Sequence, residues 1–210
     1  MANLIDPKCK QCRRTGEKLF LKGDRCFSTK CAVAKRPYAP GRTGKNARRG
    51  GLSEFGRQLM QKQKIKKIYG VLERQLKKYF IEAQAQKGDA RENLLRKFEI
   101  RLDNVVFRLG WAKSRPAARQ LVNHGHVLIN GKRVSIPSYQ VKMGEVISLT
   151  DKTNKSKLTE NLLVSLKKYT APTWLAPETE KLQAKVLEVP AGDELGDIAP
   201  IGLIVEFYSR

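Results

Sequence analysis

Residues 101–134 read RLDNVVFRLGWAKSRPAARQLVNHGHVLINGKRV and combine the patterns of two helices and a hairpin. In the first helical pattern the apolar residues follow the i, i+3, i+4, i+7 rhythm of a buried face, namely Leu102, Val105, Val106 and Leu109. A second face of the same pattern is polar and carries Arg101, Asn104 and Arg108. We therefore expect one short helix whose polar side chains share a surface.

The second helical pattern follows directly. Ser114 is suited to cap this helix, and Pro116 falls in its first turn, where a missing amide hydrogen costs little. Polar residues spaced by four line one face of it: Arg115, Arg119 and Asn123. The pair Asn130-Gly131 is a strong hairpin signal, after which the chain returns through Lys132. The sequence thus predicts a compact helix-turn-hairpin unit.

Helical patterns also precede this unit. From Ser53 to about Gln86 one apolar stripe is formed by Ile65, Ile68, Leu72, Leu76, Tyr79 and Ala83. Asp89 and Glu92 have capping-box spacing and open a further helix that ends near residue 99. These segments predict a helical domain before the hairpin unit.

Strand patterns follow the hairpin. The segments EVISL (145–149) and KVLEVP (185–190) have strand character, and a Lys-rich loop and a helical segment (160–169) lie between them. These strands and the hairpin predict a small antiparallel sheet. The apolar end IAPIGLIVEFYSR (198–210) fits either a strand or a helix on periodicity alone.

The charge of the chain indicates a polyanionic partner. Its 210 residues include 42 Lys plus Arg and 20 Asp plus Glu, which gives a formal charge of +22. Residues 1–100 hold 26 basic and 9 acidic side chains, so most of the excess lies in the first half. Nucleic acid is the expected partner of such a surface. Neither a signal peptide nor a membrane-spanning run is apparent, so we expect a soluble, intracellular protein.

The first 52 residues contain four cysteines and a basic arm. Cys9, Cys12, Cys26 and Cys31 form Cys-x2-Cys and Cys-x4-Cys pairs, which is the spacing of a knuckle that binds one structural Zn²⁺ ion. Disulfides and an iron-sulfur or redox dithiol site are the alternatives. Residues 32–52 are rich in Gly, Pro, Lys and Arg, and are expected to lie along a phosphate backbone or to form a basic tail.

The helix-turn-hairpin of residues 99–149 resembles the small RNA-binding module named after small-subunit ribosomal protein four. The same module occurs in pseudouridine synthases, tyrosyl-tRNA synthetases and a ribosome-rescue factor. The flanking stretches resemble the bacterial-type ribosomal protein family itself, and the four cysteines match its zinc-binding variant. These stretches are RPYAPGRTGKNARRGGLSEFGRQLMQKQKIKKIYGVLERQLKKYF, IPSYQVKMGEVISL, PTWL and IVEFYSR.

The resemblance implies a structural constituent of the small ribosomal subunit, located in the cytoplasm. It implies primary binding to small-subunit ribosomal RNA, nucleation of the assembly of the subunit body and a contribution to translational accuracy. The further partners implied are small-subunit ribosomal protein five and messenger RNA at the channel through which it enters. It also implies that the carboxyl-terminal segment returns as a helix to pack on the helical domain.

Together these arguments predict an α+β protein in three parts. Residues 1–45 form a zinc knuckle and basic arm, and residues 46–98 form a helical domain that 197–210 complete. Residues 99–196 form an inserted RNA-binding domain with the helix-turn-hairpin, a small antiparallel sheet and a core module at 99–163.

Two groups of residues are predicted to contact RNA, the alternative being ordinary solvated polar surface. The resemblance and the facial geometry select Arg101, Asn104, Arg108, Ser114, Arg115, Arg119, Asn123 and Lys132, and His126 is added as a backbone contact. Charge and position in the first half select Arg13, Arg14, Arg42, Lys45, Arg48, Arg49, Lys62, Lys66, Lys67 and Arg74.

No enzymatic motif is apparent in the sequence. It has no nucleophile elbow, Walker loop, dinucleotide-binding fingerprint or pair of carboxylates in an apolar setting. We therefore expect a protein that is not an enzyme. The alternatives from other classes are an RNA-modifying enzyme that uses the same module and a zinc-dependent regulator of messenger RNA or DNA.

Overall fold

The computed structural model describes residues 6–41, 51, 53–150, 162–163, 166, 169–179, 181–191 and 200–209. The chain divides into two compact units. Unit 1 comprises Met1–Leu94 with Asp197–Arg210, and unit 2 comprises Leu95–Gly196. Six of the ten residues of the predicted helix at 160–169 and residues 42–50 and 52 of the basic arm lie outside the described residues.

The described part of unit 1 is helical. Its helices are α1 (Lys8–Thr15), α2 (Asp24–Phe27), α3 (Ala32–Lys35), α4 (Glu54–Tyr69), α5 (Glu73–Ala85) and α11 (Ile201–Ser209). A further helix, α6 (Ala90–Glu99), includes residues of both units. The Asp89 carboxylate accepts a hydrogen bond from the backbone amide of Arg91 at 2.9 Å, so the predicted start of α6 is confirmed.

The apolar stripe of residues 53–86 is divided between two helices. Ser53 caps α4, because its hydroxyl oxygen accepts from the amide of Gly56 at 3.2 Å. Gly70 ends α4 with a φ of 63°, a left-handed conformation that glycine adopts without a steric penalty. Four of the apolar residues after Ser53 are almost fully buried, namely Ile65, Leu76, Tyr79 and Ala83. The stripe is therefore a buried face that continues from α4 past Gly70 into α5.

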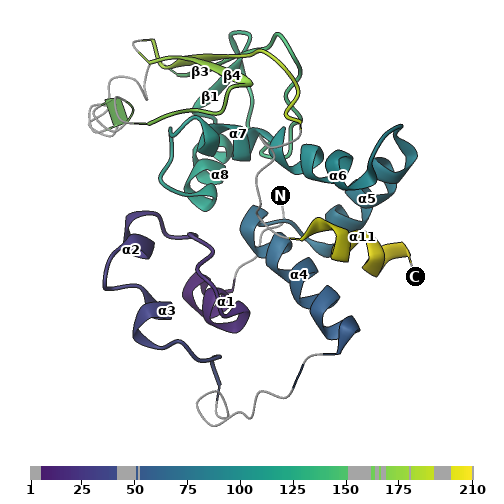
Figure 1. Ribbon diagram of the computed structural model, residues 1–210. Coiled ribbons are helices and arrows are strands. Elements are labelled where there is room, and N and C mark those ends of the chain that lie inside the picture. Colours follow the sequence, from purple (N-terminus) through teal and green to yellow (C-terminus); the bar gives the residue numbers. More distant parts are fainter. Residues whose placement is uncertain are drawn as a thin grey trace. The chain divides into compact units, whose positions relative to one another are not determined.

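The carboxyl-terminal segment is a helix and lies against α4 (Figure 1). Ile204 is fully buried, and the Tyr208 ring stacks on Phe80 of α5 with the centroids 5.1 Å apart. Periodicity could not separate helix from strand here, because the segment is apolar on most sides. The contacts with α4 and α5 give this short segment the burial that stabilises it as a helix.

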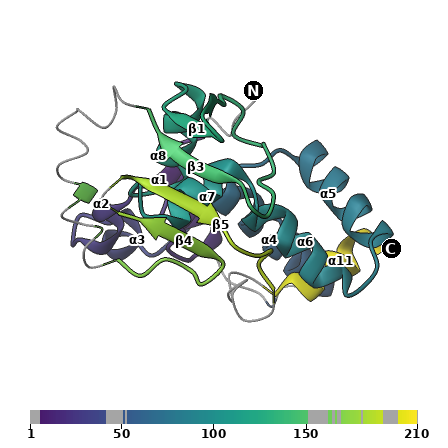
Figure 2. The same ribbon diagram turned by 90° about the horizontal axis from the view of Figure 1, so that it is seen from above.

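The described part of unit 2 combines helices with a five-stranded antiparallel sheet. They include α7 (Leu102–Arg108) and α8 (Arg115–Asn123). The strands are β1 (Val127–Ile129), β2 (Lys132–Arg133), β3 (Val146–Leu149), β4 (Leu175–Glu178) and β5 (Gln183–Val186), in the spatial order β2-β1-β3-β5-β4. Figure 2 shows β1, β3, β5 and β4 side by side. The prediction of a mixed fold with a small antiparallel sheet is confirmed.

The hairpin forms where the sequence predicts it. Asn130 and Gly131 both have positive φ, 49° and 77°, as the tight turn between β1 and β2 requires. Leu128 pairs with Arg133 across the hairpin, and Val127 pairs with Leu149 of β3. Alternate residues of β1 and β3 therefore face the same core as α7 and α8.

The core of unit 2 lies between the helices and one face of the sheet. Its buried residues come from both helices, four strands and the segments between them, and include Leu102, Val106, Val122, Val127, Ile147, Trp174, Leu175 and Ala184. Gly110 closes the turn after α7 with a φ of 74°, and a Cβ there would lie 2.9 Å from Cδ1 of Tyr169. This turn therefore requires glycine both for its backbone and for the ring packed against it.

Candidate nucleic-acid interface

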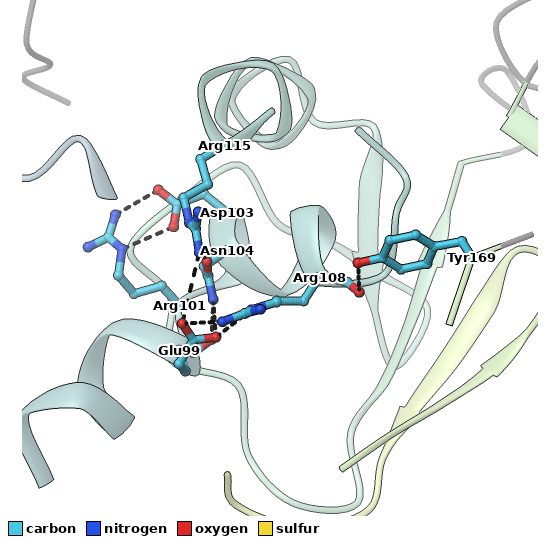
Figure 3. Close-up of polar contacts among 7 residues, drawn as sticks. All are labelled: Glu99, Arg101, Asp103, Asn104, Arg108, Arg115 and Tyr169. Atoms are coloured by element: carbon cyan, nitrogen blue, oxygen red, sulfur yellow. Dashed lines mark hydrogen bonds and ion pairs between the residues drawn. The ribbon is translucent and has the colours of Figure 1, made fainter. Parts of the chain in front are cut away.

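The polar face of α7 is occupied by a network of ion pairs (Figure 3). At its centre is Glu99, the last residue of α6, whose side chain is fully buried. Arg108 donates to both carboxylate oxygens, from Nε at 2.8 Å and from Nη2 at 3.0 Å. Asn104 donates from Nδ2 to Glu99 Oε2 at 2.9 Å and to the Glu99 carbonyl at 3.0 Å. Two predicted RNA-binding side chains are thus held by one buried acid.

Arg115 joins this network from α8. Its Nε donates to Asn104 Oδ1 at 2.8 Å, and its Nη2 lies 4.0 Å from Glu99 Oε1. Its guanidinium also lies over the Phe107 ring, 4.6 Å from the centroid. These contacts fix the angle between α7 and α8 through their polar groups as well as through the core.

A second buried acid, Asp103, holds two more arginines. Arg101 is 1% exposed and binds Asp103 through two bonds, Nε to Oδ1 at 3.0 Å and Nη2 to Oδ2 at 2.7 Å. Arg119 of α8 is 6% exposed, and its Nη1 lies 3.5 Å from Asp103 Oδ2. Bidentate pairing satisfies the carboxylate in this dry setting. Four arginines are therefore arranged on two carboxylates, which leaves a local excess of positive charge.

The remaining predicted residues of unit 2 lie at the end of α8 and on the hairpin. Ser114 is buried and caps α8, accepting from the amide of Ala117 at 3.4 Å. Asn123 and Lys132 are exposed, and His126 is partly buried. Two exposed cations that the prediction omitted lie nearby in the sequence, Lys113 and Arg133. Arg133 donates from Nη2 to the His124 carbonyl at 2.8 Å, so its charge lies beside the turn before β1.

In unit 1, Glu73 forms ion pairs with two of the lysines that were predicted to contact RNA. Lys62 donates to Glu73 Oε1 and Lys66 to Oε2, each at 2.8 Å. Tyr208 of α11 also donates to Oε1, at 2.6 Å. Lys62 is 6% exposed, and its ammonium lies 4.3 Å from the Phe207 ring centroid. Lys62 thus stabilises the attachment of α11, whereas Arg74 is exposed.

These contacts make the stability of unit 1 sensitive to acid. Burial alone would raise the pKa of Glu73, but the hydrogen bonds from Lys62, Lys66 and Tyr208 outweigh it and hold the pKa at about 2, below its ordinary value of 4.5. A pKa that is lower in the folded state means that the ionised carboxylate favours folding. That contribution is complete above about pH 5 and is lost as pH falls towards about 2.

We therefore expect the difference in unfolding free energy between wild type and Glu73→Gln to be constant near neutral pH and to shrink below pH 4.5. Urea denaturation at a series of pH values measures it. Glu82→Gln is the matched control, because Glu82 lies on the same helix and its ion pair with Lys78 is longer, 3.8 Å. A difference in unfolding free energy for Glu73→Gln that does not change with pH would contradict the lowered pKa of Glu73.

The predicted residues before α4 divide into described and undescribed ones. Arg13 is partly buried, with Nε donating to the carbonyls of Arg36 at 3.2 Å and Tyr38 at 3.0 Å. Arg14 is exposed, and Lys67 of α4 donates to Thr15 Oγ1 at 3.2 Å. The residues Arg42, Lys45, Arg48 and Arg49 lie outside the described residues.

The predicted zinc site is wrong. Over the described part of the chain, which includes all four cysteines, no group of three or more Cys, His, Asp or Glu side chains is arranged to hold a metal ion. All four cysteines are free thiols, and Cys9, Cys12, Cys26 and Cys31 line one small cavity together with apolar and basic residues. Burial raises the pKa of the Cys12 thiol. At Cys31 burial acts in the same direction, but backbone hydrogen bonds and nearby cations outweigh it and lower the pKa. Cys12, Cys26 and Cys31 are buried thiols, and Cys9 is partly buried.

Sequence reasoning selected the cations and missed the acids that organise them. Glu99, Asp103 and Glu73 each bind two or more of the predicted residues, yet none was predicted. A signal existed for Glu99, because it lies where α6 joins α7 and is the only acid within three residues before Arg101. A carboxylate beside several arginines at an apolar junction indicates a buried ion pair rather than a solvated surface.

Comparisons with known proteins give the family. The family described as "Ribosomal protein S4/S9 N-terminal domain" matches residues 3–99, and the S4 domain family matches residues 100–147. The chain is 48% identical over 210 residues to "Small ribosomal subunit protein uS4" of Ruminiclostridium cellulolyticum, and 49% identical to the protein of that name from Halothermothrix orenii. It is 49% identical over 211 residues to "Small ribosomal subunit protein uS4A" of Clostridium botulinum. All three alignments cover the full length of both chains.

Within the described ranges, every helix is too short or too polar to cross a membrane. The S4 domain match covers α7, α8 and the hairpin, and the amino-terminal match covers α1 to α6. The chain therefore belongs to the uS4 family of ribosomal proteins.

Proposed function

We propose that this protein is a structural constituent of the small ribosomal subunit and binds small-subunit ribosomal RNA. The observation that carries the proposal is the full-length identity of 48–49% with proteins named for the small ribosomal subunit. The S4 domain match at 100–147 supports RNA binding by unit 2. The role is structural rather than catalytic, and it places the protein with the ribosome in the cytoplasm.

The finer parts of the proposal rest on the family resemblance. The protein is a primary binder that nucleates assembly of the subunit body and contributes to translational accuracy. It lies near the channel through which messenger RNA enters, and its protein partner is small-subunit ribosomal protein five. Residues 46–98 with 197–210 act as a helical domain, and residues 99–196 act as an inserted RNA-binding domain with its core module at 99–163.

The physical basis of binding is the neutralisation of phosphates. A formal charge of +22 provides many weak contacts, and each cation that meets a phosphate releases a counterion. In unit 2 the buried carboxylates of Glu99 and Asp103 hold arginines in fixed positions, so that the surface is ordered before RNA arrives. Exposed groups such as Lys132 and Asn123 are then available to follow the shape of folded RNA.

Binding of the full chain to transcribed small-subunit ribosomal RNA tests the proposal. We expect Lys132→Gln to weaken binding about fivefold to tenfold, the loss of one phosphate contact, while leaving stability unchanged. Lys185→Gln is the matched control, because Lys185 is an exposed lysine on β5 of the same sheet. Equal affinity of the wild type for this RNA and for an unrelated folded RNA of the same length would contradict the proposed function.

A further inference from the structure

Two adjoining hollows lie between the amino-terminal helix α1 and helix α4 of unit 1. The larger has a volume of about 220 Å³ and is lined by Asp6, Gln11, Arg14, Gln63, Lys66 and Lys67. The smaller has a volume of about 70 Å³ and is lined by Asp6, Lys10, Gln11, Arg14 and Lys67. We call the two together the α1–α4 hollow. A water molecule occupies about 30 Å³ of liquid, so the larger part has room for a polyatomic ligand with its waters.

The walls of the hollow carry four cations and one carboxylate, that of Asp6. Lys66 is already paired with Glu73 at 2.8 Å, and Lys67 donates to the neutral hydroxyl of Thr15. Burial, and then the charge of Arg14, lower the pKa of Lys67. Lys67 and Arg14 line both parts of the hollow, so their like charges repel each other at a cost to the free protein that the single carboxylate of Asp6 offsets only in part. Such a cost is typical of a site arranged for an anion.

We propose that the α1–α4 hollow binds one phosphate group of the RNA backbone, with Arg14 and Lys67 as its principal contacts and Lys10 at its rim. This inference rests on the proposed function and adds to it a defined site in unit 1. A guanidinium donates two parallel hydrogen bonds to phosphate oxygens, and an ammonium adds a point charge. The bound phosphate removes the repulsion between the two cations, so the site favours an anion over water.

The full-length variants Arg14→Gln and Lys67→Gln test the site by binding to transcribed small-subunit ribosomal RNA over a range of salt concentrations. Each should lower the slope of log affinity against log salt by about 1 and weaken binding at low salt about tenfold. Lys77→Gln is the matched control, because Lys77 is an exposed lysine of α5 outside the hollow. Lys67→Arg should keep the wild-type slope, since it keeps the charge.

Stability separates a binding role from a structural one. Lys67→Gln removes a like-charge repulsion, so its midpoint of urea denaturation should equal or exceed that of wild type. Loss of stability together with loss of binding would assign Lys67 to the fold and overturn the inference. A second result would also overturn it. In that result the wild type binds the RNA, but the slopes of log affinity against log salt for Arg14→Gln and Lys67→Gln equal that of Lys77→Gln.

A second arm separates the RNA backbone from free phosphate. Inorganic phosphate is titrated into the wild-type protein while the side-chain nitrogen signal of Lys67 is followed by NMR. A phosphate-dependent shift that Arg14→Gln abolishes, together with the weaker RNA binding of that variant, supports the proposal. The same shift with unchanged RNA binding means a site for free phosphate and overturns it. Failure of wild type to bind the RNA would instead contradict the proposed function.

Discussion

Replacing Glu99 with Gln is expected to lower the free energy of unfolding of unit 2 by about 3 kcal/mol. The carboxylate is fully buried and accepts from Arg108 and Asn104, so its neutralisation leaves arginine charge without a counter-charge in a dry setting. Removing one partner of a buried pair costs about 3–5 kcal/mol. We place this case at the lower end, because the Arg108 side chain retains 23% exposure to solvent.

Tryptophan fluorescence during urea denaturation measures this change in unit 2 alone. Both tryptophans of the chain, Trp111 and Trp174, belong to unit 2 and are 2% exposed. Glu178→Gln is the matched control, since its ion pair with Lys181 is exposed and such pairs contribute about 0–1 kcal/mol. Adding Arg108→Leu to Glu99→Gln should recover part of the loss. A loss no greater than that of the control would show that Glu99 does not organise the network.

The affinity of the protein for small-subunit ribosomal RNA is expected to fall by about 10³-fold or more between 50 and 200 mM monovalent salt. The cause is the release of counterions from the 6–10 phosphates that a surface of this kind typically neutralises. Filter binding or fluorescence anisotropy at fixed Mg²⁺ measures the fall. As a control, chemical probing of the RNA at each salt concentration checks that the fold of the RNA does not change. A fall of less than tenfold would indicate recognition through uncharged contacts.

The local structure of unit 2 could be predicted because its signals are local. Asn130-Gly131 specifies the hairpin turn, and Ser114 specifies the start of α8. The spacing of Leu102, Val105 and Val106 identifies the buried face of α7. Each of these signals depends on residues within about one turn of each other, and the structure agrees with all of them.

The orientation of the polar side chains could not be predicted in the same way. Facial spacing brings Arg101, Asn104 and Arg108 together, but whether that face meets solvent depends on Glu99 and Asp103, whose burial is a tertiary property. Charge and position predict that Lys62 contacts RNA, yet it is buried against Glu73 and the Phe207 ring of α11, a helix far away in the sequence. Charge alone does not distinguish a cation that binds RNA from one that holds the fold.

The cysteines illustrate the same limit. Their spacing identified four residues that come to line one cavity, but spacing does not fix where the sulfurs point or whether they are ionised. The structure has three of them as buried thiols and Cys9 as a partly buried one, without a group arranged for a metal among the residues it describes. Periodicity alone does not decide the conformation of Ile201–Ser209 for a related reason, since the helix depends on contacts with α4.

The proposed place of the protein in the small ribosomal subunit is tested most directly by its amount there. Small subunits purified from cells that make the protein are washed in high salt and analysed by quantitative mass spectrometry. The loss of the protein from an assembled subunit during the wash depends on its dissociation rate rather than on its equilibrium affinity for an isolated RNA. We therefore predict close to one copy per washed subunit, in proportion to the other structural proteins. Recovery in the wash, or far fewer copies than subunits, would contradict a structural role.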